Sequence, residues 1–152
     1  MYLIYIIVSL SFIAADIISK YIVTANMPLG STIPIIENVF HLTHVRNTGA
    51  AFSMLSGQRI LLILLPILIV TAVVVYVIIK KPTSKPLLIS FSMIVSGGIG
   101  NLIDRIKLGY VIDFFDFRLI NFPVFNVADI WVTLGAALFI ILLLFSKEDN
   151  II

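Results

Sequence analysis

Residues 60 to 79, ILLILLPILIVTAVVVYVII, form a run of twenty residues without a charge. About twenty apolar residues in a helix cross the ~30 Å hydrocarbon core of a bilayer, and a soluble domain rarely buries so long a run. The rest of the chain agrees, because 61% of its 152 residues are hydrophobic and only 12% are charged. The sequence therefore predicts an integral membrane protein in which this run is a helix, bent only modestly at Pro66.

Three further apolar segments predict that the chain is a bundle of four transmembrane helices. The first segment includes Asp16 and Lys20, which are spaced i and i+4 and can pair on one helix face. The lysine turn KKPTSKP ends the second helix and begins the third, because it combines three lysines with two prolines. We expect an all-α membrane protein with one domain over residues 1–152. The predicted helices cover approximately residues 2–23, 60–79, 87–105 and 126–145.

Two longer connections contain the stretches ENVFHLTHVRNTGAAF and YVIDFFDFRLINFPVF, which are rich in β-branched and aromatic residues. Such composition predicts strands, and both connections fall on the same side of a four-helix bundle. We expect a small β element there, on the extracytoplasmic face, with both termini cytoplasmic. A raw count of Lys and Arg favours the opposite orientation. We prefer the lysine turn in the cytoplasm because its charges share one short loop, whereas several cations on the other side have an acid nearby in sequence.

Several kinds of function do not fit this sequence. The net charge of +2 comes from scattered side chains without a basic stripe, so no nucleic-acid partner is expected. The absence of cysteine excludes disulfides, thiolate nucleophiles and cysteine metal sites. His41 and His44 would point to opposite faces of a strand, so we expect no metal site and no cofactor. Ser96 has no histidine on a neighbouring helix to activate it, so we expect it to serve helix packing.

Ionisable side chains near the membrane need a partner or a function, since an isolated charge there is unfavourable by roughly 3 kcal/mol on insertion scales. Asp113 follows the third predicted helix and Asp129 begins the fourth, sixteen residues later, so a folded-back loop can bring them together. Two adjacent carboxylates share a proton and can activate a water to hydrolyse a peptide bond. Spacing alone leaves the alternative that Asp113 is a surface acid and Asp129 an acid favoured by the helix dipole.

Five short motifs occur in order among the four apolar segments: DIISK, RNTGAAFS, GGIGNLIDR, VIDFFDF and FNVADIWVTLG. Together they resemble the conserved motifs of the lipoprotein signal peptidase family, also called signal peptidase II, over essentially the whole chain. The resemblance implies an aspartic endopeptidase of the bacterial cytoplasmic membrane that cuts diacylglyceryl-modified prolipoproteins N-terminal to the lipidated cysteine. It places the catalytic pair at Asp113 and Asp129, with Asp116 as the competing acid in VIDFFDF.

The same resemblance suggests supporting roles for polar residues in the third predicted helix and the first long connection. Asn101 and Arg105 would contact the substrate backbone, and Asn47 would line the site. Asp104 would anchor Arg105 or the fold, and a purely structural salt bridge is an equally open interpretation.

Two further motifs supply residues that orient or hold the site. Asn126 precedes Asp129 by three residues and would orient its carboxylate, cap the helix, or do both. Asp16 and Lys20 are expected to pair and hold the bundle, with a substrate or lipid contact as the alternative.

The expected partners are therefore prolipoprotein substrates and membrane lipid, bound by a monomer. The alternative function is a small multispan membrane transporter that uses acidic residues as a proton relay. A transporter would place an acid deep in a helix and away from loops, whereas Asp113 and Asp129 lie at one boundary of the predicted helices. A non-catalytic scaffold, in which the polar residues only join helices, is a third interpretation.

Overall fold

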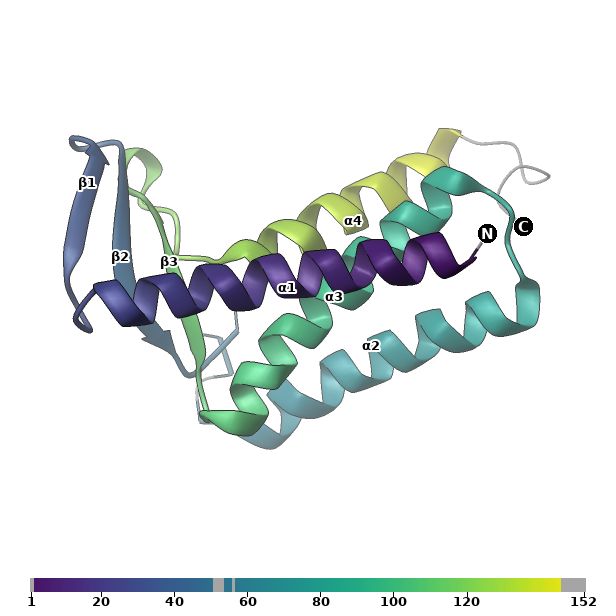
Figure 1. Ribbon diagram of the computed structural model, residues 1–152, viewed down its shortest axis with the longest axis horizontal. Helices are drawn as coiled ribbons and strands as arrows, with labels where there is room; N and C mark the ends of the chain where they lie inside the picture. The colour runs from purple at the N-terminus through teal and green to yellow at the C-terminus, as the bar shows by residue number, and fades with distance from the viewer. Residues whose placement is uncertain (1, 51–53, 56, 146–152) are drawn as a thin grey trace.

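The chain folds into four long helices with a small sheet at one end (Figure 1). The computed structural model describes residues 2–50, 54–55 and 57–145. Residues 51–53 of the RNTGAAFS motif and the polar tail after Phe145 lie outside the described residues. The elements are α1 (Tyr2–Asn26), β1 (Thr32–Ile36), β2 (Phe40–Asn47), α2 (Arg59–Lys80), α3 (Lys85–Lys107), β3 (Val111–Phe117), η2 (Arg118–Ile120) and α4 (Val127–Phe145).

All four predicted helices are present, with ends that differ from the predicted ones by at most three residues. Each is long and apolar enough to cross a membrane. Their outer faces are covered by exposed aliphatic side chains, and α2 buries only Leu62 among its 22 residues. An apolar surface of this extent is stable only against hydrocarbon or another apolar partner. The structure therefore agrees with the prediction of a membrane protein.

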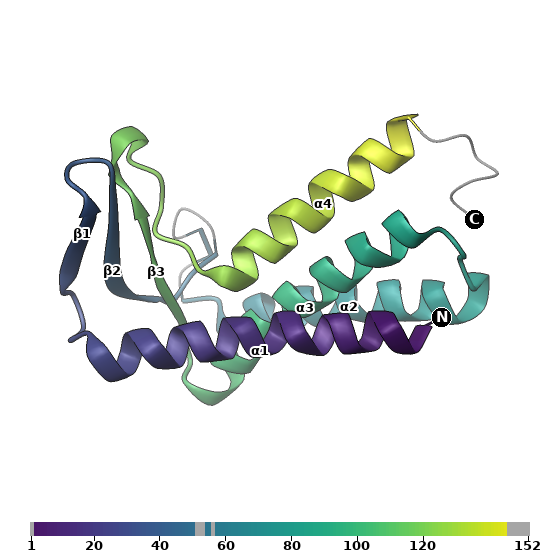
Figure 2. The same cartoon turned by 45° about the horizontal axis from the view of Figure 1, so that its top comes forward.

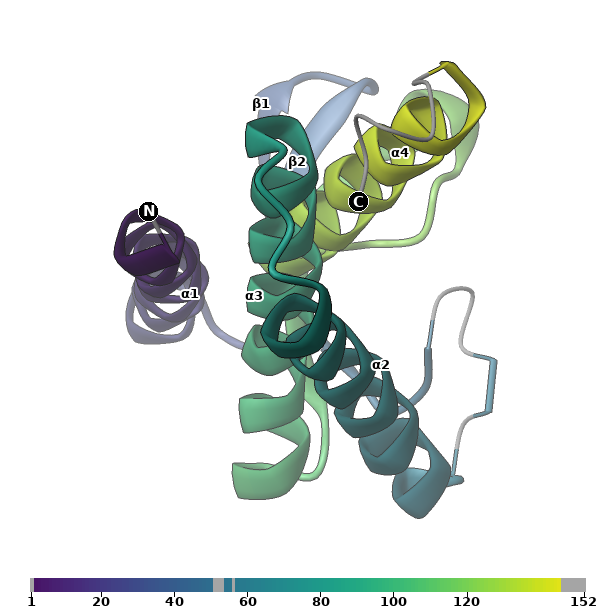
Figure 3. The same cartoon turned by 90° about the vertical axis from the view of Figure 1, so that its right-hand side faces the viewer.

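Helix α3 is the centre of the bundle and lies between α1 on one side and α2 and α4 on the other (Figure 3). Small residues allow these close approaches, because a Cβ on Gly135 would lie 2.8 Å from the Cβ of Met93. The hydroxyl of Ser96 donates to the carbonyl of Ser9 at 3.0 Å, so it joins α3 to α1. This contact supports the prediction that Ser96 is a packing residue.

The sheet has the antiparallel order β1-β2-β3, as Figure 2 shows. The two long connections therefore pair with each other, as their composition predicted. Val45 lies opposite Asp113, and Asn47 lies opposite Val111. Phe114 on β3 packs with Val23 and Met27 at the end of α1, which fixes the sheet against the helices.

One end of the molecule therefore holds the sheet, and the opposite end holds the start of α1, the lysine turn and the end of α4 (Figure 1). Asp113 lies within β3 itself, and Asp129 lies in the first turn of α4. The polar residues of the motifs meet where the sheet joins the helices.

Candidate active site

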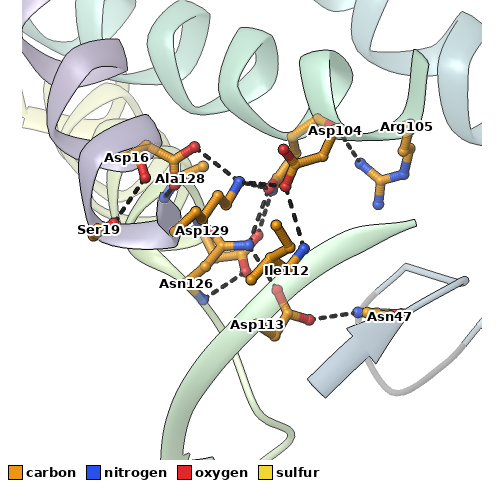
Figure 4. A network of polar contacts seen from close by, with 12 residues as sticks. Asp16, Ser19, Asn47, Asp104, Arg105, Ile112, Asp113, Asn126, Ala128 and Asp129 are labelled. Carbon is orange, nitrogen blue, oxygen red and sulfur yellow. Dashed lines mark hydrogen bonds and ion pairs between the residues drawn. The ribbon is translucent and has the colours of Figure 1, made fainter. Parts of the chain in front are cut away.

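The Asp113 carboxylate is almost completely buried, with 2% of the residue exposed. Two side-chain amides donate to it, Asn47 Nδ2 to Oδ2 at 2.9 Å and Asn126 Nδ2 to Oδ1 at 2.7 Å (Figure 4). Burial raises the pKa of Asp113 to about 6, and the negative charge of Asp129 adds to the rise, while the two amide hydrogen bonds oppose it. Asp113 is therefore a carboxyl group that takes up a proton at higher pH than an ordinary aspartate.

Asp129 is held by a reciprocal cap at the start of α4. Its Oδ2 accepts the backbone N–H of Asn126 at 3.1 Å, and Asn126 Oδ1 accepts the backbone N–H of Asp129 at 3.0 Å. This arrangement satisfies two backbone donors that a helix start would otherwise leave unpaired. Asn126 therefore both caps α4 and orients Asp129, so the two interpretations of this residue are compatible.

Two asparagine amides connect the two aspartates. Asn101 Nδ2 donates to Asp129 Oδ1 at 2.7 Å, and Asn126 Nδ2 donates both to Asn101 Oδ1 at 3.0 Å and to Asp113 Oδ1. We refer to Asn101 and Asn126 as the amide bridge, and Figure 4 labels Asn126 together with Asp113 and Asp129. The bridge brings together the two carboxylates that the sequence paired, although they belong to a strand and a helix.

A cluster of buried charges lies next to the amide bridge. Lys20 Nζ lies 2.8 Å from Asp16 Oδ2 and 3.0 Å from Asp104 Oδ2, and it donates to Asn101 Oδ1 at 3.1 Å. Asp16 also accepts the backbone N–H of Ala128 at 2.9 Å. The predicted pair of Asp16 and Lys20 is thus present, and it connects α1 to α3 and to the start of α4.

Asp104 and Arg105 have different partners. The carboxylate of Asp104 pairs with Lys20 and accepts the backbone N–H of Ile112 at 3.2 Å. The guanidinium of Arg105 instead donates to the carbonyl of Gly49 at 3.1 Å. Adjacent positions on a helix point in different directions, so Asp104 and Arg105 reach different partners. The structure therefore favours the interpretation that Asp104 anchors the fold and not Arg105.

Asp116, the competing acid in VIDFFDF, lies in a separate polar network on the sheet. Its Oδ2 accepts a hydrogen bond from Thr43 at 2.6 Å and another from Arg118 Nε at 2.9 Å. Burial alone raises the pKa of Asp116, but these hydrogen bonds and the charge of Arg118 outweigh it and hold that pKa below its usual value. An acid with these partners stays ionised, and within the described residues its carboxylate binds Thr43 and Arg118 and not Asp129, so it is a poorer candidate for a proton-sharing pair.

The two histidines serve the sheet. His44 Nδ1 lies 2.8 Å from the carbonyl of Met27, and His41 Nδ1 lies 3.3 Å from the hydroxyl of Thr32. Across residues 2–50, 54–55 and 57–145, no three histidine, aspartate or glutamate side chains are grouped as metal ligands.

A cavity of about 620 Å³ opens beside the two aspartates. Its polar wall includes Asp113, Asp129, Asn101, Arg105 and Asn47. The remaining wall is largely apolar and comes from α2, α3, α4 and the segment before α4. A cavity of this kind suits a substrate that combines a peptide bond with a long apolar portion.

Sequence reasoning missed the connections that involve the backbone. The amides of Ile112 and Ala128 and the carbonyl of Gly49 each bind a side chain of the site, but a backbone group has no signature in the sequence. The small residue at Gly49 was the only available signal, because it allows another group to approach the chain closely.

The chain is similar to known proteins over most of its length. The family model described as signal peptidase (SPase) II matches residues 8–145. A lipoprotein signal peptidase of Halothermothrix orenii is 44% identical over 142 residues, which cover 93% of this chain and 95% of the relative. One of Clostridioides difficile is 42% identical over 148 residues, with 97% and 99% covered.

Two solved structures have the same fold, and both are described as bacterial membrane enzymes determined by the in meso method. The structure at 2.3 Å resolution has a TM-score of 0.89 at 32% identity, and the match covers 96% of this chain and 90% of the chain in that structure. The structure at 1.9 Å resolution has a TM-score of 0.85 at 32% identity and covers 94% of each chain. These similarities favour the peptidase over the transporter and the scaffold. The chain therefore belongs to the signal peptidase II family and is a bacterial membrane hydrolase.

Proposed function

We propose that Asp113 and Asp129 are the catalytic pair with which this signal peptidase II removes signal peptides from prolipoproteins. The observation that supports this assignment is the amide bridge, which ties both carboxylates together at the wall of one cavity. The raised pKa of Asp113 gives the pair one member that can carry a proton. Among the acids of the motifs, these two alone line the cavity.

The two aspartates have different roles in this proposal. Asp129, which accepts two N–H groups, acts as the general base and removes a proton from a water molecule. The water oxygen then forms a bond to the carbonyl carbon of the scissile peptide. Protonated Asp113 donates a hydrogen bond to the carbonyl oxygen, and the C–N bond breaks as the amine takes up the proton that Asp129 removed from the water.

The remaining polar residues position this pair. Asn47, Asn101 and Asn126 hold the carboxylates through their amides. Asp16, Lys20 and Asp104 fix the helices that carry them. Arg105 lines the cavity, and in this proposal it contacts the substrate backbone.

The substrate in this proposal is a prolipoprotein whose cysteine carries diacylglyceryl, and the cut falls N-terminal to that cysteine. The apolar cavity walls suit the signal helix and the acyl chains. The enzyme acts as a monomer formed by a single domain over residues 1–152, without a cofactor.

We further propose that the four helices each span the cytoplasmic membrane, with the sheet and the site outside and both termini inside. Because the chain has no cysteine, single cysteines report the orientation cleanly. Thr83→Cys in the lysine turn should react with a membrane-impermeant thiol reagent only after the cells are opened. Leu119→Cys near the sheet should react in intact cells, and the reverse pattern would invert the orientation.

The decisive test of catalysis is cleavage of a diacylglyceryl-modified prolipoprotein by purified wild type, Asp113→Asn and Asp129→Asn. Both variants should retain a folded structure by circular dichroism and lose nearly all turnover. Asp116→Asn is the matched control, since it removes an acid from the same strand and should still cleave. Cleavage by either folded dyad variant at the wild-type rate would refute the assignment.

A further inference from the structure

Arg59 lies across the junction between α3 and β3. Its Nη2 donates to the carbonyls of Arg105 at 3.0 Å and Ile106 at 3.2 Å, in the last turn of α3. A Cβ on Gly109 would lie 3.7 Å from Arg59 Cζ, so the guanidinium also borders the turn that leads into β3. The side chain is exposed, so part of its charge faces the surroundings.

Two more cations lie on the same junction. Arg46 Cζ is 4.7 Å from the ring centroid of Tyr110, the residue after Gly109. Lys107 is the last residue of α3 and precedes Gly109 by two positions. We refer to Arg46, Arg59 and Lys107 as the basic corner. Figure 1 shows the junction of α3 and β3 that these residues border.

The basic corner is exposed and lacks acidic partners. All three side chains are exposed, and in the described part of the chain none forms an ion pair with an aspartate or glutamate. By contrast, Arg118 on the sheet is paired with Asp116. Cations that border the same junction without acidic partners repel each other, and an anion from outside the chain would relieve that repulsion.

Exposed aliphatic residues adjoin Arg59 and Lys107 in sequence. Ile60 is 75% exposed, Ile106 is 55% exposed and Leu108 is 45% exposed. All three adjoin the basic corner in sequence, and they continue the apolar surface of α2 and α3 that faces lipid. Cations bordered by apolar side chains suit the boundary between phosphate groups and acyl chains.

We propose that the basic corner binds the phosphate group of an anionic phospholipid, whose acyl chains lie against Ile60, Ile106 and Leu108. The proposal gives a role to the three cations of the basic corner, which lie at the sheet end of the molecule. It depends on the surface alone and is independent of which residues catalyse cleavage. Arg46 also lines the cavity, so the bound lipid would sit at the edge of the site.

The test uses the full chain in bilayer nanodiscs, with a bimane fluorophore on Leu108→Cys as the only thiol. Quenching by doxyl-labelled phosphatidylglycerol is compared with quenching by doxyl-labelled phosphatidylcholine. One cation near a membrane surface favours an anionic lipid by roughly fivefold in binding constant. We expect a preference of at least about fivefold at residue 108 that weakens as salt is added, because salt screens exposed charges.

Matched controls separate a local site from a general attraction. A bimane on Leu119→Cys lies at the same end of the molecule and should show little preference between the two lipids. Lys107→Gln should reduce the preference at residue 108 without affecting folding, since the exposed side chain of Lys107 makes no hydrogen bond or ion pair within the described residues. Arg118→Gln removes one charge from a paired cation and should leave the preference unchanged.

Equal quenching by the two lipids at residue 108 would overturn the proposal. An equal preference at residues 108 and 119 would also overturn it, because the attraction would then be general. Displacement by excess soluble glycerol phosphate would identify a site for free phosphate and exclude the lipid. Retention of the full preference in the Lys107→Gln variant and in an Arg46→Gln variant would show that the corner is not the source.

Discussion

Replacing Asp113 by asparagine should stabilise the folded protein at alkaline pH although it removes activity. The carboxyl is 2% exposed, and its pKa is raised from 3.8 to about 6, first by burial and then by the charge of Asp129. A carboxyl with a raised pKa binds more protons in the folded than in the unfolded state. Its ionisation therefore destabilises the fold progressively as the pH rises from about 4 to above 6. Asparagine has a similar shape and carries no charge.

The size of this effect follows from the shift. A rise of about two pKa units at 1.36 kcal/mol each gives a penalty of about 3 kcal/mol near pH 8, and well under 1 kcal/mol near pH 4. Asparagine cannot accept the amides of both Asn47 and Asn126 as a carboxylate does, and one lost hydrogen bond subtracts about 1 kcal/mol. The net gain is about 2 kcal/mol near pH 8 and disappears near pH 4.

Thermal unfolding in detergent micelles over a series of pH values measures this difference. For a chain of this size 1 kcal/mol corresponds to ~2–4 °C, so the melting temperature near pH 8 should rise by roughly 4–8 °C. Asp116→Asn provides a control of opposite sign. The pKa of Asp116 is lowered, so its charge stabilises the fold above the unfolded pKa, and that stability is lost as the pH falls. The reasoning would be refuted if Asp113→Asn did not raise the melting temperature near pH 8, or if it raised the melting temperature equally near pH 4 and pH 8.

Three further substitutions test how the site is built into the fold. Gly100→Ala places a Cβ 2.6 Å from Asp16 Oδ2, so stability should fall by about 1–3 kcal/mol in thermal unfolding. Lys20→Met leaves the carboxylates of Asp16 and Asp104 buried without their cation, and should lower the free energy of unfolding by about 3–5 kcal/mol, with partial recovery when Asp16→Asn is added. Asn126→Ala removes a helix cap and part of the amide bridge, so about 0.5–2 kcal/mol of stability and most of the turnover should be lost together. A variant that lost turnover but no stability would contradict this last expectation.

The sequence predicted the elements of the fold because their signals are local. A run of twenty uncharged residues in α2 leaves little choice beyond a membrane helix. The strands followed from β-branched and aromatic residues in two connections on one side of the bundle. The register of the sheet, which places Val45 opposite Asp113, depends on a bulge between Leu42 and Val45 and has no local signal.

The candidate site was predictable only in part, for the same reason. Spacing suggested that Asp113 and Asp129 could meet, and the motif resemblance selected them from the other acids. The partner of Asp104 could not be found in this way, because Lys20 lies on a different helix and far away in sequence. The helical spacing of Asp16 and Lys20 did predict their own pair, since residues i and i+4 share a face in any helix.

The orientation of the Asn101 amide shows how the buried charges determine the geometry of the proposed catalytic pair. Its Oδ1 accepts hydrogen bonds from both Lys20 and Asn126, which can only donate at those atoms. Its Nδ2 must therefore face Asp129, and rotating the amide would leave two donors opposed to an NH2 group. A buried ammonium ion in a long apolar helix is unfavourable unless it is paired, and Lys20 has two carboxylates that satisfy this need. The same ion thus joins α1 to α3 and holds the amide that contacts Asp129, so the stability of the bundle and the alignment of the two aspartates depend on one set of contacts.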